Sequence, residues 1–150
     1  PNQVLGVFSP YWVEPLAEVL RQLGSEHVLV VHADDGLDEI SIAAPTRVAE
    51  LREGDISVYT VTPEDFGLQR ADLSAIAVEN AEQSLAMITA VVDDQPGPAR
   101  DIVCLNAGAA IYAAGLASSL AEGVALAGEV IQSGKARQTH AALVDVSNSV

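Results

Sequence analysis

Aromatic residues are scarce in this chain of 150 residues, which contains one Trp, three Tyr and two Phe. Hydrophobic residues nevertheless make up 49% of the chain, enough for a substantial core in one domain of ordinary size. The core must therefore be built mainly from Ala, Val, Leu and Ile. Apolar faces rich in alanine predict helices that pack closely together.

Basic residues are also few, with 7 Lys and Arg against 21 Asp and Glu, giving a formal net charge of −14. Nucleic acid and anionic membranes are poor partners for such a surface, because phosphate contacts need Lys or Arg. The simplest role of the charge is solubility. An acidic chain can still bind a phosphate substrate if a divalent metal ion neutralises both sides.

The single cysteine, Cys104, excludes a disulfide framework within the chain. It lies in the apolar run Ile102–Leu105, which predicts a buried core residue rather than a nucleophile, and a cytosolic, cytoplasmic location is the simplest setting. No signal peptide is apparent, and no uncharged apolar stretch reaches the roughly 18–20 residues needed to span a membrane. The chain begins at Pro1 without an initiator Met, as a fragment or a processed chain would.

Strand patterns dominate the first third of the chain. Residues Gln3–Phe8 predict a short buried strand, and the β-branched run His27–His32 predicts a strand covered on both faces. Between them, Ser9 and Pro10 have the chemistry of a helix start, and Gly24 that of a helix end. Strand, helix and strand at this spacing predict a βαβ unit with parallel strands.

Two further strands and several helices follow. Residues 47–51 and 56–61 flank the turn Arg52–Asp55 and predict a hairpin, and Thr62–Gly67 predicts a single helical turn. Longer helices are expected at residues 80–92, 99–114, 119–133 and 135–145, where close helix packing would explain the internal Gly108, Gly123 and Gly128. The chain is therefore predicted to be an α/β domain with a mixed central sheet and flanking helices.

An acidic cluster after the strand His27–His32 is the strongest local signal for chemistry. In open α/β sheets, ligands bind outside the carboxyl ends of the strands. Mg²⁺ prefers oxygen ligands and usually takes one or two carboxylates together with substrate phosphates and water. The segment Asp34–Gly36 has the simpler interpretation of a turn.

Asp38 and Glu39 differ from that turn, because they lie between Leu37 and Ile40 in a segment with strand character. In an extended backbone the two carboxylates would point to opposite faces. They could share one ion only if the backbone bends locally; otherwise each side chain would serve a different ion.

The other candidate residues have plainer interpretations. His32 ends the strand at the rim where a site would form, and a strand-end histidine with a satisfied hydrogen bond explains it best. His27 and His140 are interpreted as ordinary surface or capping residues. No His/Cys cluster has zinc spacing, and neither a nucleophile elbow nor a Walker-type loop is present. Gly6 within a strand predicts close approach of backbone or ligand.

Several motifs in fixed order carry a resemblance. The strand Gln3–Phe8 runs into a helix containing Pro15–Leu20, and Gly36–Ser41 reads Gly-Leu-Asp-Glu-Ile-Ser. The later segments are Thr62–Gly67, Leu105–Ala110 and Ser119–Gly123. In the sequence and order of these motifs, the chain resembles the anthranilate phosphoribosyltransferase family over nearly its whole length.

The resemblance implies a reaction and a metal. The family transfers phosphoribosyl from 5-phosphoribosyl-1-pyrophosphate (PRPP) to the amine of anthranilate in tryptophan biosynthesis, and pyrophosphate is released. The resemblance also implies that the Asp-Glu pair, here Asp38 and Glu39, binds Mg²⁺. It assigns no catalytic role to any residue of the chain. A full-length enzyme of this kind is expected to be a homodimer.

Other family motifs are absent from the chain. The N-terminal helical region, the glycine-rich PRPP loop, the Lys-His-Gly-Asn-type motif and the Arg for the anthranilate carboxylate have no counterpart here. Residues 1–150 are therefore expected to form a single partial α/β domain, the distal part of a nucleoside phosphorylase/phosphoribosyltransferase-type domain. Its expected partner is the missing N-terminal portion, and little turnover is expected without it.

Two alternatives remain at this point. A pyrimidine nucleoside phosphorylase-like enzyme would use phosphate and a nucleoside on the same architecture, although the segment Gly36–Glu39 argues against it. A non-catalytic, nucleic-acid-binding paralogue would need a basic groove, for which the chain offers only seven scattered cations.

Overall fold

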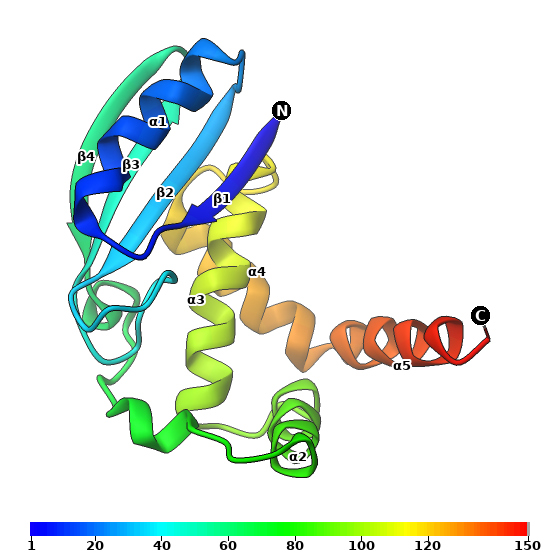
Figure 1. Cartoon of the computed structure of the whole chain (residues 1–150). Helices are drawn as coiled ribbons and strands as arrows, with labels where there is room; N and C mark the ends of the chain where they lie inside the picture. Colours follow the sequence, from blue (N-terminus) through cyan, green and yellow to red (C-terminus); the bar gives the residue numbers. More distant parts are fainter. Residues whose placement is uncertain (150) are drawn as a thin grey trace.

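A four-stranded mixed sheet lies at the centre of the computed structural model, which describes residues 1–149. Strand β1 (Asn2–Gly6) pairs in parallel with β2 (His27–Ala33). Strands β3 (Thr46–Arg52) and β4 (Asp55–Val61) continue the sheet in antiparallel pairings, in the order β1-β2-β3-β4. The predicted mixed α/β sheet is therefore confirmed (Figure 1).

The predicted βαβ unit is present between β1 and β2. Ser9 accepts a hydrogen bond from the Tyr11 amide at the start of the short helix η1 (Pro10–Trp12), which leads into α1 (Val13–Gln22). Gly24 follows the helix with φ of +84°, a conformation that glycine adopts without steric cost. The predicted start at Ser9 and the predicted end at Gly24 are therefore both confirmed.

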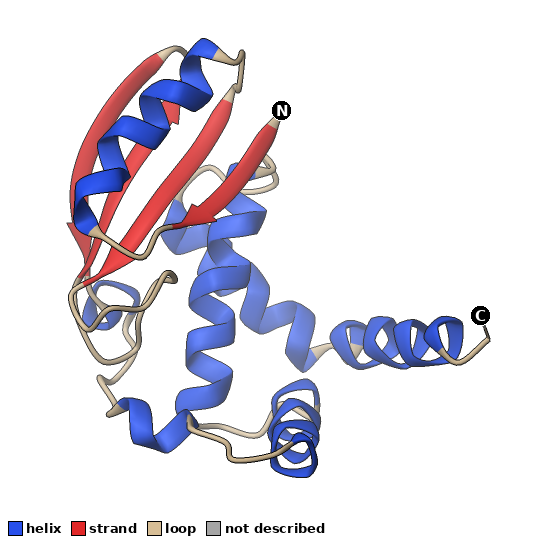
Figure 2. Ribbon diagram, viewed as in Figure 1, coloured by secondary structure: helices blue, strands red, loops and turns tan. Residues whose placement is uncertain are grey.

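The sheet is the middle of three layers. All seven residues of β2 are buried, and its side chains alternate between the two faces. Val28 and Val30 pack on the side of α1, whereas Leu29 and Val31 belong to the larger cluster formed with α3 and α4. Figure 2 shows α1 on one face of the sheet and the longer helices on the other. The strand His27–Ala33 is thus covered on both faces, as its composition predicted.

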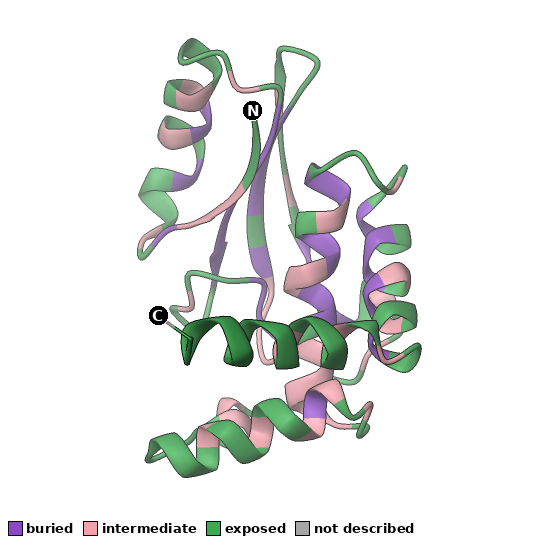
Figure 3. Ribbon diagram, turned by 90° about the vertical axis from the view of Figure 1, so that its right-hand side faces the viewer, coloured by how far each residue is buried: buried purple, intermediate pink, exposed green. Residues whose placement is uncertain are grey.

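The chain after β4 is helical, as expected for its second half. Its elements are η2 (Pro63–Phe66), η3 (Leu73–Ile76), α2 (Ala81–Val92), α3 (Pro98–Ala113), α4 (Leu120–Gln132) and α5 (Lys135–Ser147). Only the short η3 was not predicted. Helix α5 has no buried residue (Figure 3) and projects from the domain (Figure 1). No helix within residues 1–149 has the length and hydropathy required to cross a membrane.

Glycine lets α3 and α4 approach until their backbones touch. A Cβ atom on Gly123 would lie 2.3 Å from the carbonyl oxygen of Gly108, and one on Gly108 would lie 2.5 Å from the amide nitrogen of Val124. Close helix packing is therefore confirmed at these two positions. Gly128 differs, because the nearest atom to a Cβ there would be Nη2 of Arg100, at 3.7 Å.

A buried polar network joins three strands to α3 near the amino end of β2. Oε1 of Glu50 accepts a hydrogen bond of 2.7 Å from the Tyr112 hydroxyl and lies 2.9 Å from Nε2 of His27. Oε2 accepts a hydrogen bond of 2.8 Å from Tyr59. The ring of His27 also meets that of Tyr112 edge to face. The prediction of a surface role for His27 was therefore wrong, because its partners lie far away in the sequence.

The α3–α4 contact predicts opposite effects for two equivalent substitutions. Gly123→Ala places a methyl group against a carbonyl oxygen and should lower the free energy of unfolding by about 1–3 kcal/mol. Gly128→Ala is the matched control, since its methyl group meets no close atom. It should raise stability by up to about 1 kcal/mol, because alanine is the better helix former. Urea unfolding measures both, and equal effects would contradict the packing.

The polar network predicts a loss of stability at alkaline pH. Burial, followed by the neighbouring Glu50, raises the pKa of Tyr59 above its usual value. An unfolded tyrosine releases its proton near pH 10, whereas the folded one keeps it, so stability should fall as pH rises above about 10. Tyr59→Phe should cost about 1 kcal/mol at neutral pH through the lost hydrogen bond, yet show a shallower alkaline decline.

Urea unfolding at several pH values between neutral and strongly alkaline gives this profile. Tyr11→Phe is the matched control, because it removes a hydroxyl from a side chain that is 71% exposed. An alkaline decline as steep in Tyr59→Phe as in the unsubstituted protein would contradict the assigned role.

Candidate functional site

The acidic loop, residues 34–45, leaves the carboxyl end of β2 and returns as β3. Asp38 and Glu39 are both exposed to solvent, whereas Ile40 and Ile42 are 1% and 0% exposed. The loop contains only turns and bends, so the strand character predicted for the segment between Leu37 and Ile40 was wrong. Its isoleucines are buried in the core under α3, and no neighbouring strand pairs with its main chain.

The first part of the acidic loop is the predicted turn. Gly36 has φ of +96°, and its amide donates a hydrogen bond of 2.9 Å to the Ala33 carbonyl. Asp35 supports the turn with both oxygens: Oδ1 accepts from the Leu37 amide at 3.2 Å, and Oδ2 accepts from the Ser41 hydroxyl at 2.5 Å. The carboxylate of Asp35 is thus occupied in holding the loop, which confirms the turn interpretation.

Helix α3 fixes the middle of the acidic loop through Asn106. The Ile40 amide donates to Oδ1 of Asn106, and Nδ2 of Asn106 donates to the Ile40 carbonyl, both at 2.9 Å. These two bonds replace those that a neighbouring strand would have made. Asn106 lies in Leu105–Ala110, one of the segments that carry the resemblance, but no role was predicted for it, because its partner is 66 positions away.

Strand β1 also contacts the acidic loop, at Asp38. A Cβ atom on Gly6 would lie 1.6 Å from the carbonyl oxygen of Asp38 and 2.6 Å from its carbonyl carbon. Any side chain at this position would therefore displace the loop. The close backbone approach predicted for Gly6 is confirmed, and its partner is the main chain of Asp38.

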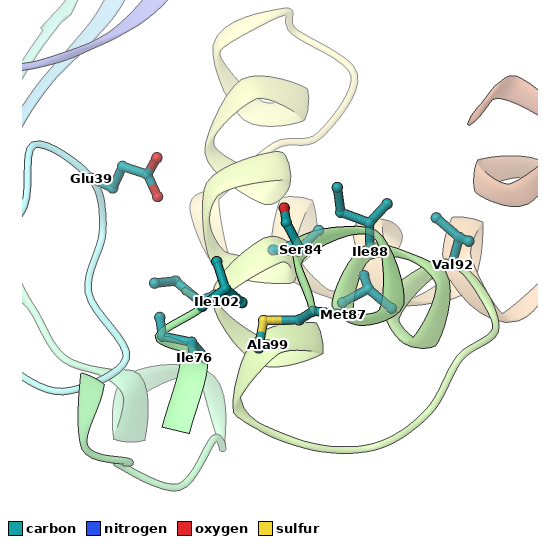
Figure 4. Close-up of a pocket in the computed structure, with 11 residues that line it drawn as sticks. Glu39, Ile76, Ser84, Met87, Ile88, Val92, Ala99 and Ile102 are labelled. Carbon is teal, nitrogen blue, oxygen red and sulfur yellow. The ribbon is translucent and has the colours of Figure 1, made fainter. Parts of the chain in front are cut away.

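The adjacent carboxylates border different hollows. Asp38 lines a pocket of about 440 Å³ together with Gly6, Phe8 and Trp12. Glu39 stands at the edge of a second, apolar pocket of about 400 Å³ between the loop and helices α2 and α3 (Figure 4). Residues 1–149 contain no group of three or more His, Cys, Asp or Glu side chains placed to enclose a metal ion.

His32 has a structural role at the carboxyl end of β2. It is 6% exposed, and its Nδ1 lies 2.7 Å from the carbonyl oxygen of Val7. This contact ties the end of β2 to the residue after β1. The interpretation as a strand-end histidine with a satisfied hydrogen bond is confirmed.

The arginines of the domain are largely engaged by its own carboxylates. Ion pairs join Arg21 to Glu18, Arg47 to Glu14, Arg70 to Glu64, Arg100 to Asp94 and Arg137 to Asp93. The hydrogen bonds from Arg70 hold the pKa of Glu64 at about 2. Four of these five pairs are exposed to solvent, and in each the carboxylate competes with a phosphate for the guanidinium group.

Cys104 belongs to the core rather than to a reactive site. It is 3% exposed, and burial raises the pKa of its thiol, which disfavours the nucleophilic thiolate. The prediction from the apolar run around it is confirmed.

Relatives of the chain share one name. It is 64% identical over 149 residues to the anthranilate phosphoribosyltransferase of Thioalkalivibrio sulfidiphilus, covering 99% of this chain and 44% of that protein. It is 60% identical over 147 residues to that of Methylococcus capsulatus, covering 98% and 43%. The chain thus spans about 44% of the length of the curated relatives it matches.

Solved structures agree with the fold. The crystal structure of anthranilate phosphoribosyltransferase from Thermus thermophilus matches with a TM-score of 0.80 at 44% identity, over 89% of this chain and 39% of that one. The Saccharomyces cerevisiae enzyme in complex with PRPP and Mg matches with a TM-score of 0.86 over 99% of this chain and 43% of that one. At 22% identity, the second match shows the shared fold alone.

A family model described as "Glycosyl transferase family, a/b domain" matches residues 1–137, which is most of the chain. The mixed sheet, the covering helices and the relatives all agree with that match. The chain therefore belongs to the glycosyl transferase family, as part of its α/β domain.

Proposed function

We propose that this chain is the metal-binding part of an anthranilate phosphoribosyltransferase, which transfers phosphoribosyl from PRPP to the amine of anthranilate and releases pyrophosphate. The names of relatives at 60–64% identity support this activity. The observation that carries it in the structure is the exposed pair Asp38 and Glu39 at the carboxyl ends of β1 and β2, where α/β sheets bind ligands.

Asp38 and Glu39 would hold Mg²⁺. The fit is chemical: both side chains offer hard oxygen ligands, both are exposed, and Mg²⁺ commonly binds one or two carboxylates with substrate phosphates and water completing its shell. Because the two carboxylates border different hollows, each is expected to serve its own ion. Mg²⁺ bound there would stabilise the negative charge on the departing pyrophosphate oxygens.

The rest of the active site would come from outside this chain. The domain carries a net charge of −14, and five of its arginines are already paired with carboxylates. The cationic groups for the phosphates and for the anthranilate carboxylate would therefore lie in the remaining portion of the enzyme. The homodimer implied by the resemblance stays a prediction, as does the cytoplasmic location expected from the single cysteine.

The alternatives receive less support. A pyrimidine nucleoside phosphorylase would share the architecture, but the relatives with the identities given above carry the name of the anthranilate enzyme. A nucleic-acid-binding paralogue would need free cations along a groove, whereas the ion pairs engage most of the arginines.

Substituting the acidic pair in the complete enzyme tests the proposal. Asp38→Asn and Glu39→Gln should each lower kcat/KM by about 100-fold, equivalent to about 3 kcal/mol of lost transition-state stabilisation. The loss of anthranilate fluorescence in the presence of PRPP and Mg²⁺ measures turnover. A chelator of divalent ions should abolish this turnover. Residues 1–150 alone should show little turnover until the remaining portion is added.

Asp34→Asn is the matched control, because it removes an exposed carboxylate from the turn in the same loop. It should keep nearly full activity. If all three variants were equally active, the metal role of Asp38 and Glu39 would be wrong. An intact complete enzyme that gave no product from PRPP and anthranilate would refute the proposed activity.

A further inference from the structure

The amide side chain of Asn106 holds the main chain of the acidic loop next to its two exposed carboxylates. Its Oδ1 accepts from the Ile40 amide at 2.9 Å, and its Nδ2 donates to the Ile40 carbonyl at 2.9 Å. The same Nδ2 also donates to the Ile102 carbonyl, one turn earlier in α3, at 3.0 Å. Both polar atoms of the side chain are therefore engaged, and its orientation is fixed from two directions.

Ile40 is a firm point of attachment. Its side chain is 1% exposed and lies in the core cluster that includes Leu105, the neighbour of Asn106 in α3. A buried main-chain amide and carbonyl need partners, and in this irregular loop the partners come from Asn106 instead of a neighbouring strand. Glu39 directly precedes this fixed residue, so the peptide that joins Glu39 to Ile40 has little freedom.

Gly6 limits the acidic loop at a second point, Asp38. The carbonyl group of Asp38 lies against the main chain of β1, where a Cβ atom would be only 1.6 Å from the oxygen. The segment from Asp38 to Ile40 is therefore held by β1 at its first residue and by the side chain of Asn106 at its last. Main-chain motion that would redirect either carboxylate is restricted at both ends of this short segment.

We propose that Asn106 is a positioning residue for the metal-binding carboxylates. By fixing the main chain at Ile40, it sets the direction in which Glu39, and through it Asp38, presents its carboxylate to a metal ion that arrives with the substrate. Groups that orient metal ligands without touching the metal are generally important for affinity. The inference rests on the proposed function, since it assumes that these carboxylates bind Mg²⁺.

A purely structural role is the competing explanation, in which Asn106 only ties α3 to the acidic loop. Asn80 separates the two roles. It is also an asparagine whose Oδ1 accepts a main-chain hydrogen bond, from Gln83 at 2.9 Å, but it caps α2 outside the loop. Asn80→Ala should therefore reduce stability without altering metal binding.

The test uses the complete enzyme with Asn106→Ala, Asn106→Leu, Asn80→Ala and Glu39→Gln. Leucine approximates the shape of asparagine without its polar atoms, so this variant decides the question if the alanine variant does not fold. Two quantities are measured: the Mg²⁺ concentration for half-maximal activity at saturating PRPP, and the Kd of Mn²⁺ by electron paramagnetic resonance with PRPP but without anthranilate. The KM for anthranilate and urea unfolding are recorded alongside them.

Both Asn106 variants should raise the Mg²⁺ requirement and the Kd of Mn²⁺ by about 10- to 100-fold, with the KM for anthranilate unchanged. If Glu39→Gln raises these two values but the Asn106 variants behave like Asn80→Ala, positioning is refuted while the proposed function stands. If Glu39→Gln also leaves them unchanged, the proposed metal role itself fails. The two failures are thus distinguishable.

Discussion

The hydrogen bonds between the Asn106 side chain and the main chain of Ile40 determine where the acidic loop can lie. Helix α3 can make them because it is itself tightly placed, with the backbones of Gly108 and Gly123 in contact where α3 crosses α4. The glycine contact between α3 and α4 therefore helps to fix the position of α3, and through it the positions of the Asp38 and Glu39 carboxylates. The loop needs such external support because it has no strand partner of its own.

The two ends of the sheet have different roles. Near the amino end of β2, Glu50 gathers His27, Tyr59 and Tyr112 into a network that closes the sheet against α3. At the carboxyl end, the neighbouring carboxylates are left in solvent beside open pockets. The Glu50 network stabilises the fold, because its polar groups have internal partners. The two solvent-exposed carboxylates remain accessible to a ligand. This arrangement agrees with ligand binding at the carboxyl ends of strands.

Local chemistry made much of the fold predictable. The apolar run at His27–His32, the Ser9 cap and the turn at Arg52–Asp55 each depend on adjacent residues, and all were confirmed. Contacts between distant residues could not be predicted. His27 was interpreted as a surface or capping residue because Glu50 and Tyr112 give no local signal. The loop was assigned strand character because apolar Leu37 and Ile40 flank its two acids, whereas Ile40 is in fact buried as part of an irregular loop.

The central claim is that Asp38 and Glu39 bind divalent ions that accompany a sugar pyrophosphate. Anomalous diffraction from crystals of the complete protein grown with Mn²⁺ and PRPP tests it most directly. The account predicts anomalous peaks within ligand distance of these carboxylates and of the pyrophosphate oxygens. Well-ordered PRPP with Mn²⁺ bound away from both side chains would contradict it.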